Sequence, residues 1–249
     1  AKYLYDNGIV PRDDLTIEAG GTVHRLHLYT RFGTVGLVTV DMGKPAFEPA
    51  NVPVALEGER VIDRPVTIAG GEYRITCLSM GNPHCVVFAD RVDEVDVAHL
   101  GPQFEHADIF PARTNTEFIR VVNRTTIKMR VWERGNGETR ACGTGACAAV
   151  VAATENGLCP KGEPITVKVS GGDLIVTYDD DGVRLTGNAE GVKVGGKLAL
   201  SARKLVVSAL VENLPDEIVV DVTELGVGKT IFVGDLEFEN LKFITPATT

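Results

Sequence analysis

The sequence predicts an α+β protein that carries a small all-β segment at its C-terminal end. Three observations support this fold class. Short β-prone runs separated by Gly and Pro fill most of the chain, residues 143–157 form one helix-like segment of small apolar residues, and after Leu200 only short β runs remain, without Cys or His. The 249 residues are enough for two modest domains or one large one.

The β-prone runs follow one another with turn residues between them. Gly20-Gly21 and Gly70-Gly71 are the clearest turns, and they predict hairpins. We expect strands near residues 15–18, 23–29, 36–40, 64–68, 72–78, 85–89, 117–122, 126–133, 165–169, 174–178 and 183–186.

Three helical segments are expected. Residues 143–157 are apolar almost all round and end at Gly157, a pattern that is typical of a buried helix. A short helix is expected near 95–100. Residues 1–7 have the pattern of the last turns of a helix, which Gly8 and Pro11 end. No capping residue precedes those turns, so we expect further residues upstream in the natural protein.

Charge and cysteine content narrow the class of protein. The net charge of −9 and the absence of a Lys/Arg cluster argue against a nucleic-acid partner. No apolar run is long enough for a membrane helix and no signal peptide is visible, so a cytoplasmic location is expected. Five cysteines, an odd number, argue against a disulfide framework. A zinc site of Cys and His84 is a minor alternative, and we expect no metal.

The segment from Trp132 to Gly145 is the best candidate for chemistry. It runs from a strand end through a glycine-rich loop to Cys142 at the start of the 143–157 helix. Free N–H groups and the positive end of the helix dipole favour a thiolate there. The N–H groups of Gly143 and Thr144 also suit a carboxylate. The alternative is a plain turn with a small buried Cys. The Gly-Lys-Ser/Thr of a nucleotide P-loop is absent.

Two further polar segments are weak signals on their own. In Gly81-Asn82-Pro83-His84, Asn82 could bind a ligand and His84 could transfer a proton, although Asn-Pro usually marks a turn. The polar loop at residues 113–118 contains Asn115 just before a predicted strand.

Together the three segments resemble the diaminopimelate epimerase family, in order and spacing. Residues 133–146 match its E-R-G-x-G-E-T-x-A-C-G-[ST]-G-A motif, and residues 81–84 and 113–118 match its G-N-P-H and R-x-N-x-x-F elements. Residues 186–192 resemble its closing T-G-P-A segment, with Asn188 in place of Pro. The resemblance covers residues 1–200.

This resemblance implies mixed sheets wrapped around a central helix, and conversion of LL- to meso-diaminopimelate for lysine and cell-wall precursors. No cofactor is required: one thiolate removes the α-proton and a thiol delivers a proton to the other face. It assigns acid–base catalysis to Cys142, with Glu133 and His84 as helpers. Substrate binding is assigned to Asn82, Asn115, Glu133, Arg134 and the N–H groups of Gly143 and Thr144.

The family's other cysteine belongs to a C-G-N-x-x-R-C motif that has no counterpart here, since no cysteine precedes Cys77. We therefore expect an incomplete first domain, residues 1–68 with a strand at 192–200, and a second domain at residues 69–191. Activity is expected to be impaired, and a homodimer is possible. The alternatives are an inactive remnant or binding protein of the same fold, and a racemase or epimerase acting on proline or hydroxyproline. Arg134, Asn82 and Asn115 favour diaminopimelate.

The tail, residues 201–249, is expected to be a separate β module with short runs near 204–211, 217–222 and 229–233. Residues 212–225 resemble the C-terminal β domain of CTC-type ribosomal proteins. The third alternative is therefore a ribosome-associated module. The tail has eight acidic and four basic residues, which argues against direct contact with RNA.

Overall fold

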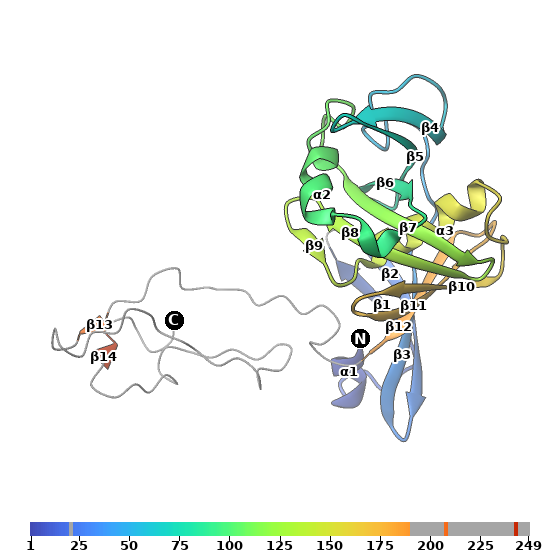
Figure 1. Cartoon of the computed structure of the whole chain (residues 1–249). Helices are drawn as coiled ribbons and strands as arrows, with labels where there is room; N and C mark the ends of the chain where they lie inside the picture. The colour runs from blue at the N-terminus through green and yellow to red at the C-terminus, as the bar shows by residue number, and fades with distance from the viewer. Residues whose placement is uncertain (20–21, 190–206, 209–241, 244–249) are drawn as a thin grey trace. The chain divides into compact units, whose positions relative to one another are not determined.

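Twelve strands form one continuous mixed sheet in the part of the chain that precedes residue 190 (Figure 1). The computed structural model describes residues 1–19, 22–189, 207–208 and 242–243. The sheet order is β1-β2-β3-β12-β11-β10-β8-β7-β6-β5-β4, and β9 pairs with β8. The strands are β1 (Asp14–Ala19), β2 (Thr22–Arg31), β3 (Thr34–Asp41), β4 (Val61–Ile68), β5 (Gly71–Ser79), β6 (Pro83–Phe88), β7 (Asn115–Asn123), β8 (Thr126–Glu133), β9 (Gly137–Thr139), β10 (Pro164–Val169), β11 (Gly172–Tyr178) and β12 (Val183–Asn188).

Two strand pairs are parallel, β6 with β7 and β8 with β10. Parallel neighbours need a long crossover connection, and each pair has one that contains a helix. The 3-10 helix η1 (Val92–Glu94) and the helix α2 (Val97–Glu105) connect β6 to β7. The helix α3 (Gly143–Glu155) lies between β8 and β10. The crossovers therefore place both helices beside the centre of the sheet.

Helix α3 is the centre of the main hydrophobic core. Every residue from Gly145 to Ala153 is buried, as its all-round apolar pattern predicts. The helix contacts strands β5 to β8 and β10 to β12, and the sheet curves around it in Figure 1. Small Ala and Val side chains let so many strands approach one helix. Gly157 adopts a φ of 73° just beyond the helix end, and this confirms its predicted role.

The N-terminal residues form the predicted helix end. Helix α1 (Lys2–Asp6) is followed by Gly8 with a φ of 68°. Lys2 Nζ donates to the carbonyl oxygen of Val35 at 2.7 Å, and Asp6 Oδ1 accepts from the Val35 N–H at 2.9 Å. These bonds attach α1 to β3, beside a small apolar cluster from β1 to β3.

Residues 191–249 form a second compact unit. Within it the structure describes one antiparallel pair, β13 (Val207–Ser208) and β14 (Lys242–Phe243). The expected strand at 192–200 lies outside the described residues, as do the tail runs apart from Val207–Ser208. In the described part of the chain, no helix has the length and apolar character needed to cross a bilayer.

Candidate active site around Cys142

Cys142 is the N-cap residue of α3, at the position that the sequence predicts. Its backbone is extended, with φ of −132° and ψ of 115°, and the N–H of Gly145 donates to its Sγ at 3.4 Å. The hydroxyl of Thr144 lies 3.5 Å from the same sulfur. The N–H groups of Gly143 and Thr144 belong to the first helical turn, where no carbonyl of the helix can accept from them. They remain suited to an anion.

The start of α3 lowers the pKa of Cys142 as expected, but the expectation of a thiolate is contradicted, because burial and other groups raise the pKa more. Burial, and then the negative charge of Glu117, raises the pKa of Cys142 to about 11. The charge of Glu133 acts in the same direction, whereas the hydrogen bonds from Thr144 and Gly145 lower the pKa. Loss of hydration and two nearby carboxylates therefore outweigh the helix N-terminus. Cys142 is a thiol at neutral pH in this structure.

The Asn82–His84 segment meets the start of α3. It lies at the β5–β6 connection, where Gly81 turns the chain with a φ of 90°. Asn82 Nδ2 donates to Thr144 Oγ1 at 3.3 Å, and His84 Nε2 lies 3.0 Å from Asn82 Oδ1. Two motifs that are far apart in the sequence are thus joined by hydrogen bonds beside Cys142.

His84 has a buried partner that the sequence analysis missed. Its Nδ1 lies 2.7 Å from Oε1 of Glu117 in β7, and both side chains are fully buried. Glu117 was overlooked because it stands in an apolar strand run, Glu-Phe-Ile, and was read only as part of that strand. A charged residue pointing into a core is the signal that could have revealed it, since charged side chains are seldom buried without a partner.

Asn115 joins two loops of the site. Its Nδ2 donates to the carbonyl oxygen of Pro83 at 2.8 Å, and its Oδ1 accepts from the N–H of Arg134 at 2.9 Å. The Arg134 guanidinium donates to the carbonyl oxygen of Ala112 at 2.8 Å. Glu133, at the end of β8, accepts a hydrogen bond from the Thr139 hydroxyl. Hydrogen bonds therefore link Asn115 to the backbone at Pro83 and Arg134, whereas the Glu133 carboxylate and the Arg134 guanidinium bond other residues.

Glu105 is a second buried carboxylate that the sequence did not reveal. It lies at the end of α2 and accepts hydrogen bonds from Trp132 Nε1 at 2.7 Å and from the Gly135 N–H at 3.1 Å. Arg113 lies 3.6 Å away. Glu105 thereby fixes the glycine-rich loop that follows Glu133.

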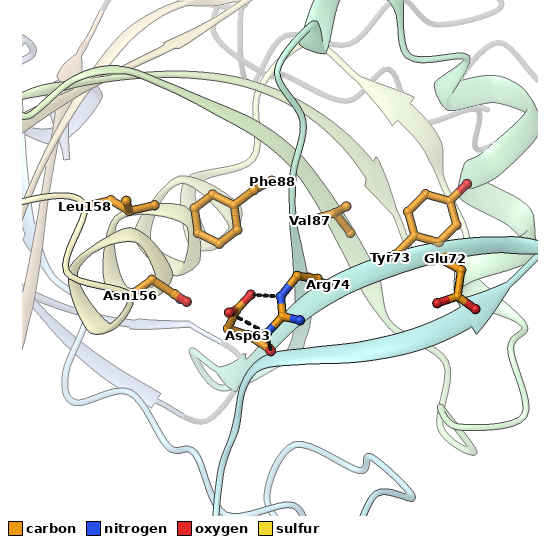
Figure 2. Close-up of a pocket in the computed structure, with 8 residues that line it drawn as sticks. All are labelled: Asp63, Glu72, Tyr73, Arg74, Val87, Phe88, Asn156 and Leu158. Atoms are coloured by element: carbon orange, nitrogen blue, oxygen red, sulfur yellow. Dashed lines mark hydrogen bonds and ion pairs between the residues drawn. The ribbon is translucent and has the colours of Figure 1, made fainter.

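A separate pocket of about 450 Å³ lies beside β4 and β5 and contains none of the predicted site residues. In Figure 2, Asp63 and Arg74 form an ion pair at its wall, with Phe88 and Leu158 nearby. Arg74 Nε donates to Asp63 Oδ1 at 2.6 Å, and this bond lowers the pKa of Asp63. Asp63 and Arg74 thus already satisfy each other, and Glu72, the third charged residue of the lining, accepts a hydrogen bond from Thr67. Among the described residues, no group of three or more His, Cys, Asp or Glu side chains could hold a metal ion.

Solved structures share the fold at low identity. A probable proline racemase from Agrobacterium radiobacter K84 aligns with a TM-score of 0.56 at 17% identity, over 75% of this chain and 62% of that one. A hydroxyproline epimerase from Agrobacterium vitis aligns with a TM-score of 0.54 at 16% identity, over 75% and 61%. The chain thus spans less than two thirds of these two proteins.

Two family models match different parts of the sequence. The model described as "Ribosomal protein TL5, C-terminal domain" matches residues 182–249, which confirms the resemblance of the tail. Its match begins at Gly182, so it includes β12, which lies between β3 and β11 in the main sheet. The model described as "Diaminopimelate epimerase" matches residues 76–192.

Curated relatives named diaminopimelate epimerase are far more similar than the solved structures. The protein from Desulfovibrio desulfuricans is 45% identical over 196 residues, which is 76% of this chain and 68% of that protein. The protein from Geobacillus kaustophilus is 47% identical over 197 residues, 78% and 68%. A relative from Methanococcus maripaludis is 41% identical over 196 residues. Such identity, over about two thirds of the relatives' length, shows that the chain belongs to the diaminopimelate epimerase family.

Proposed function

We propose that this chain carries one face of a cofactor-independent diaminopimelate epimerase site, with Cys142 as an acid–base group. The observation that supports this most strongly is the hydrogen-bonded set around the start of α3. His84 is bonded to Asn82 and Asn82 to Thr144, and the Thr144 hydroxyl lies beside the Cys142 thiol. A plain turn with a small buried Cys would not need such a set of polar partners.

The protonation state of Cys142 suits the step that delivers a proton. With its pKa raised to about 11, the side chain is a thiol that can donate to an α-carbanion: the S–H bond breaks, a C–H bond forms and a thiolate remains. The reverse reaction requires a thiolate, which binding of the substrate's α-ammonium group beside the sulfur would favour.

The remaining residues fit a cage for an amino acid. The N–H groups of Gly143 and Thr144 suit the α-carboxylate, where they would stabilise charge that develops at the α-carbon. Asn82, Asn115, Glu133 and Arg134 supply amide, carboxylate and guanidinium groups for both ends of diaminopimelate. The reaction class is isomerisation, in lysine biosynthesis.

The second face of the α-carbon lacks a comparable thiol among the described residues. Cys77 and Cys85 belong to the core beside α2, Cys147 is fully buried within α3, and Cys159 follows the end of α3 that is opposite Cys142. His84 is the only helper that we assign to that face. Loss of one positioned acid–base group commonly costs about 10²- to 10⁴-fold in rate, so we expect at most a trace of epimerisation from the 249-residue chain.

The test is exchange of the α-hydrogen of diaminopimelate in deuterium oxide, followed by mass spectrometry. Chiral chromatography of the LL and meso isomers then separates exchange from inversion. Exchange should be lost in Cys142→Ala. The matched control is Cys159→Ala, which should behave like the unmodified chain. Turnover at about 1–10³ s⁻¹, a normal enzymatic pace, would contradict impaired activity. Exchange that survives Cys142→Ala would contradict the role of Cys142.

Three other functions stay as candidates. An inactive binding protein would bind diaminopimelate in calorimetry but would not exchange its α-hydrogen. Proline or hydroxyproline in the exchange assay would test the activities that the similar structures are named for. The family match of residues 182–249 favours a ribosome-associated role for the tail, which co-sedimentation of the chain with ribosomes would test.

A further inference from the structure

We propose that Glu117 is a positioning residue of this site, which fixes the His84 ring through the same carboxylate oxygen that faces Gly145 and Cys142. This role of Glu117 rests on the proposed function, because an epimerase would use a positioned His84 and a protonated Cys142. The contacts of Glu117 and the experiments below do not depend on turnover.

The hydrogen bonds of His84 determine where its protons lie. Asn82 Nδ2 donates to Thr144 Oγ1, so Asn82 Oδ1 is the atom that faces His84 Nε2. A carbonyl oxygen only accepts, so Nε2 must carry a proton. On the other side of the ring, one proton lies between Nδ1 and Glu117 Oε1, which are 2.7 Å apart. Glu117 and Asn82 together therefore fix both the orientation and the tautomer of His84.

Gly145 shows how close the same carboxylate is to Cys142. A Cβ atom at Gly145 would lie 2.7 Å from Glu117 Oε1 and 3.3 Å from Cys142 Sγ. The two side chains thus share the space that the glycine leaves open. The other carboxylate oxygen of Glu117 is buried without a hydrogen-bond partner among the described residues. A buried charge with so few partners acts strongly on its neighbours.

Glu117 consequently connects the two groups that the proposed reaction uses. The charged groups that face Cys142 are Glu117 from β7 and Glu133 from β8, both negative. Glu117 bonds the His84 ring on one side and disfavours the Cys142 thiolate on the other. A carboxylate that only held β7 in place would not need to lie against both His84 and Cys142.

The first experiment compares the full unmodified chain with the Glu117→Gln variant. In each, peptide mapping measures the rate of Cys142 alkylation as a function of pH. Gln keeps the shape and can still accept from His84, but it removes the charge. We expect the pH at which alkylation of Cys142 is half-maximal to fall by about one unit in Glu117→Gln. At any pH below both midpoints, this corresponds to about tenfold more thiolate. Glu155→Gln is the matched control, since Glu155 lies at the opposite end of α3, bonded to Tyr178 and Arg60.

A folded Glu117→Gln chain whose midpoint stays unchanged or rises would overturn the proposal. If that variant does not fold, nitrogen NMR of the imidazoles in the unmodified chain decides. The expected result is a protonated Nε2 of His84 and a far-downfield Nδ1 proton, and an unprotonated Nε2 would overturn the proposal. Both readouts work without substrate, so a failure of diaminopimelate to exchange would count against the proposed function alone.

Discussion

The indole N–H of Trp132 donates to Glu105 Oε2 at 2.7 Å, and this bond joins the end of α2 to β8 just before the site loop. The other oxygen of Glu105 accepts from the N–H of Gly135. Glu105 is only 3% exposed, so its carboxylate relies on these donors and on nearby Arg113 in place of water. One buried carboxylate thus holds the loop that follows Glu133.

We expect Glu105→Ala to lower the free energy of unfolding by about 1–3 kcal/mol, because it leaves buried donors without an acceptor. Urea denaturation followed by Trp132 fluorescence measures this. The control is Glu138→Ala, which removes a more exposed carboxylate paired with Arg130 in the same region and should cost at most about 1 kcal/mol. Equal effects of the two substitutions would show that Glu105 has no special role.

Gly101 in α2 packs directly against Trp132. A Cβ atom there would lie 2.3 Å from Trp132 Cδ2, far inside van der Waals contact. We expect Gly101→Ala to cost about 1–3 kcal/mol through overpacking, which exceeds the gain of up to about 1 kcal/mol in helix propensity. Gly36→Ala is the control, since its nearest atom would be 3.9 Å away. A stabilised Gly101→Ala protein in thermal unfolding would contradict this packing.

Cys142 should be the thiol that iodoacetamide modifies first, because it is the most exposed of the five cysteines, at 8%. Burial raises its pKa to about 11, so its thiolate fraction and labelling rate should rise about tenfold per pH unit below that value. Burial raises the pKa of Cys147 more strongly, inside the apolar helix. Peptide mapping after limited labelling at pH 7 to 10 tests the order, and faster reaction of Cys147 or Cys159 would disprove it.

A chain that ends at Glu190 should keep the fold of the main sheet. The proposed separate tail module begins near residue 201, and residues 191–249 form their own compact unit. We expect hydrogen-exchange protection of residues 144–153 to be unchanged by the deletion, because α3 is covered by strands that precede residue 190. Broad loss of that protection would show instead that the tail completes the expected first domain, residues 1–68.

Local sequence was enough to locate the strands of the main sheet other than β9, which was expected to be part of the glycine-rich loop, and also the C-terminal ends of α1 and α3 and the place of Cys142. A run of small apolar residues that begins after Cys and ends at Gly157 predicts a buried helix with that Cys at its N-terminus, because periodicity and capping act within a few residues. The motif resemblance selected Asn82, His84, Asn115, Glu133 and Arg134 as one site. Hydrogen bonds link His84 to Asn82 and the Arg134 N–H to Asn115.

Only the tertiary structure decided what surrounds these groups. The pairing of β12 with both β3 and β11 joins segments from opposite ends of the epimerase-like region into one sheet. The contacts of Glu117 with His84, and of Glu105 with Trp132, depend on which strands and helices are neighbours. The helix terminus alone favoured a Cys142 thiolate, but burial and the charge of Glu117 reverse that preference. Desolvation and Coulomb interactions depend on distances in space, and spacing along the chain does not determine them.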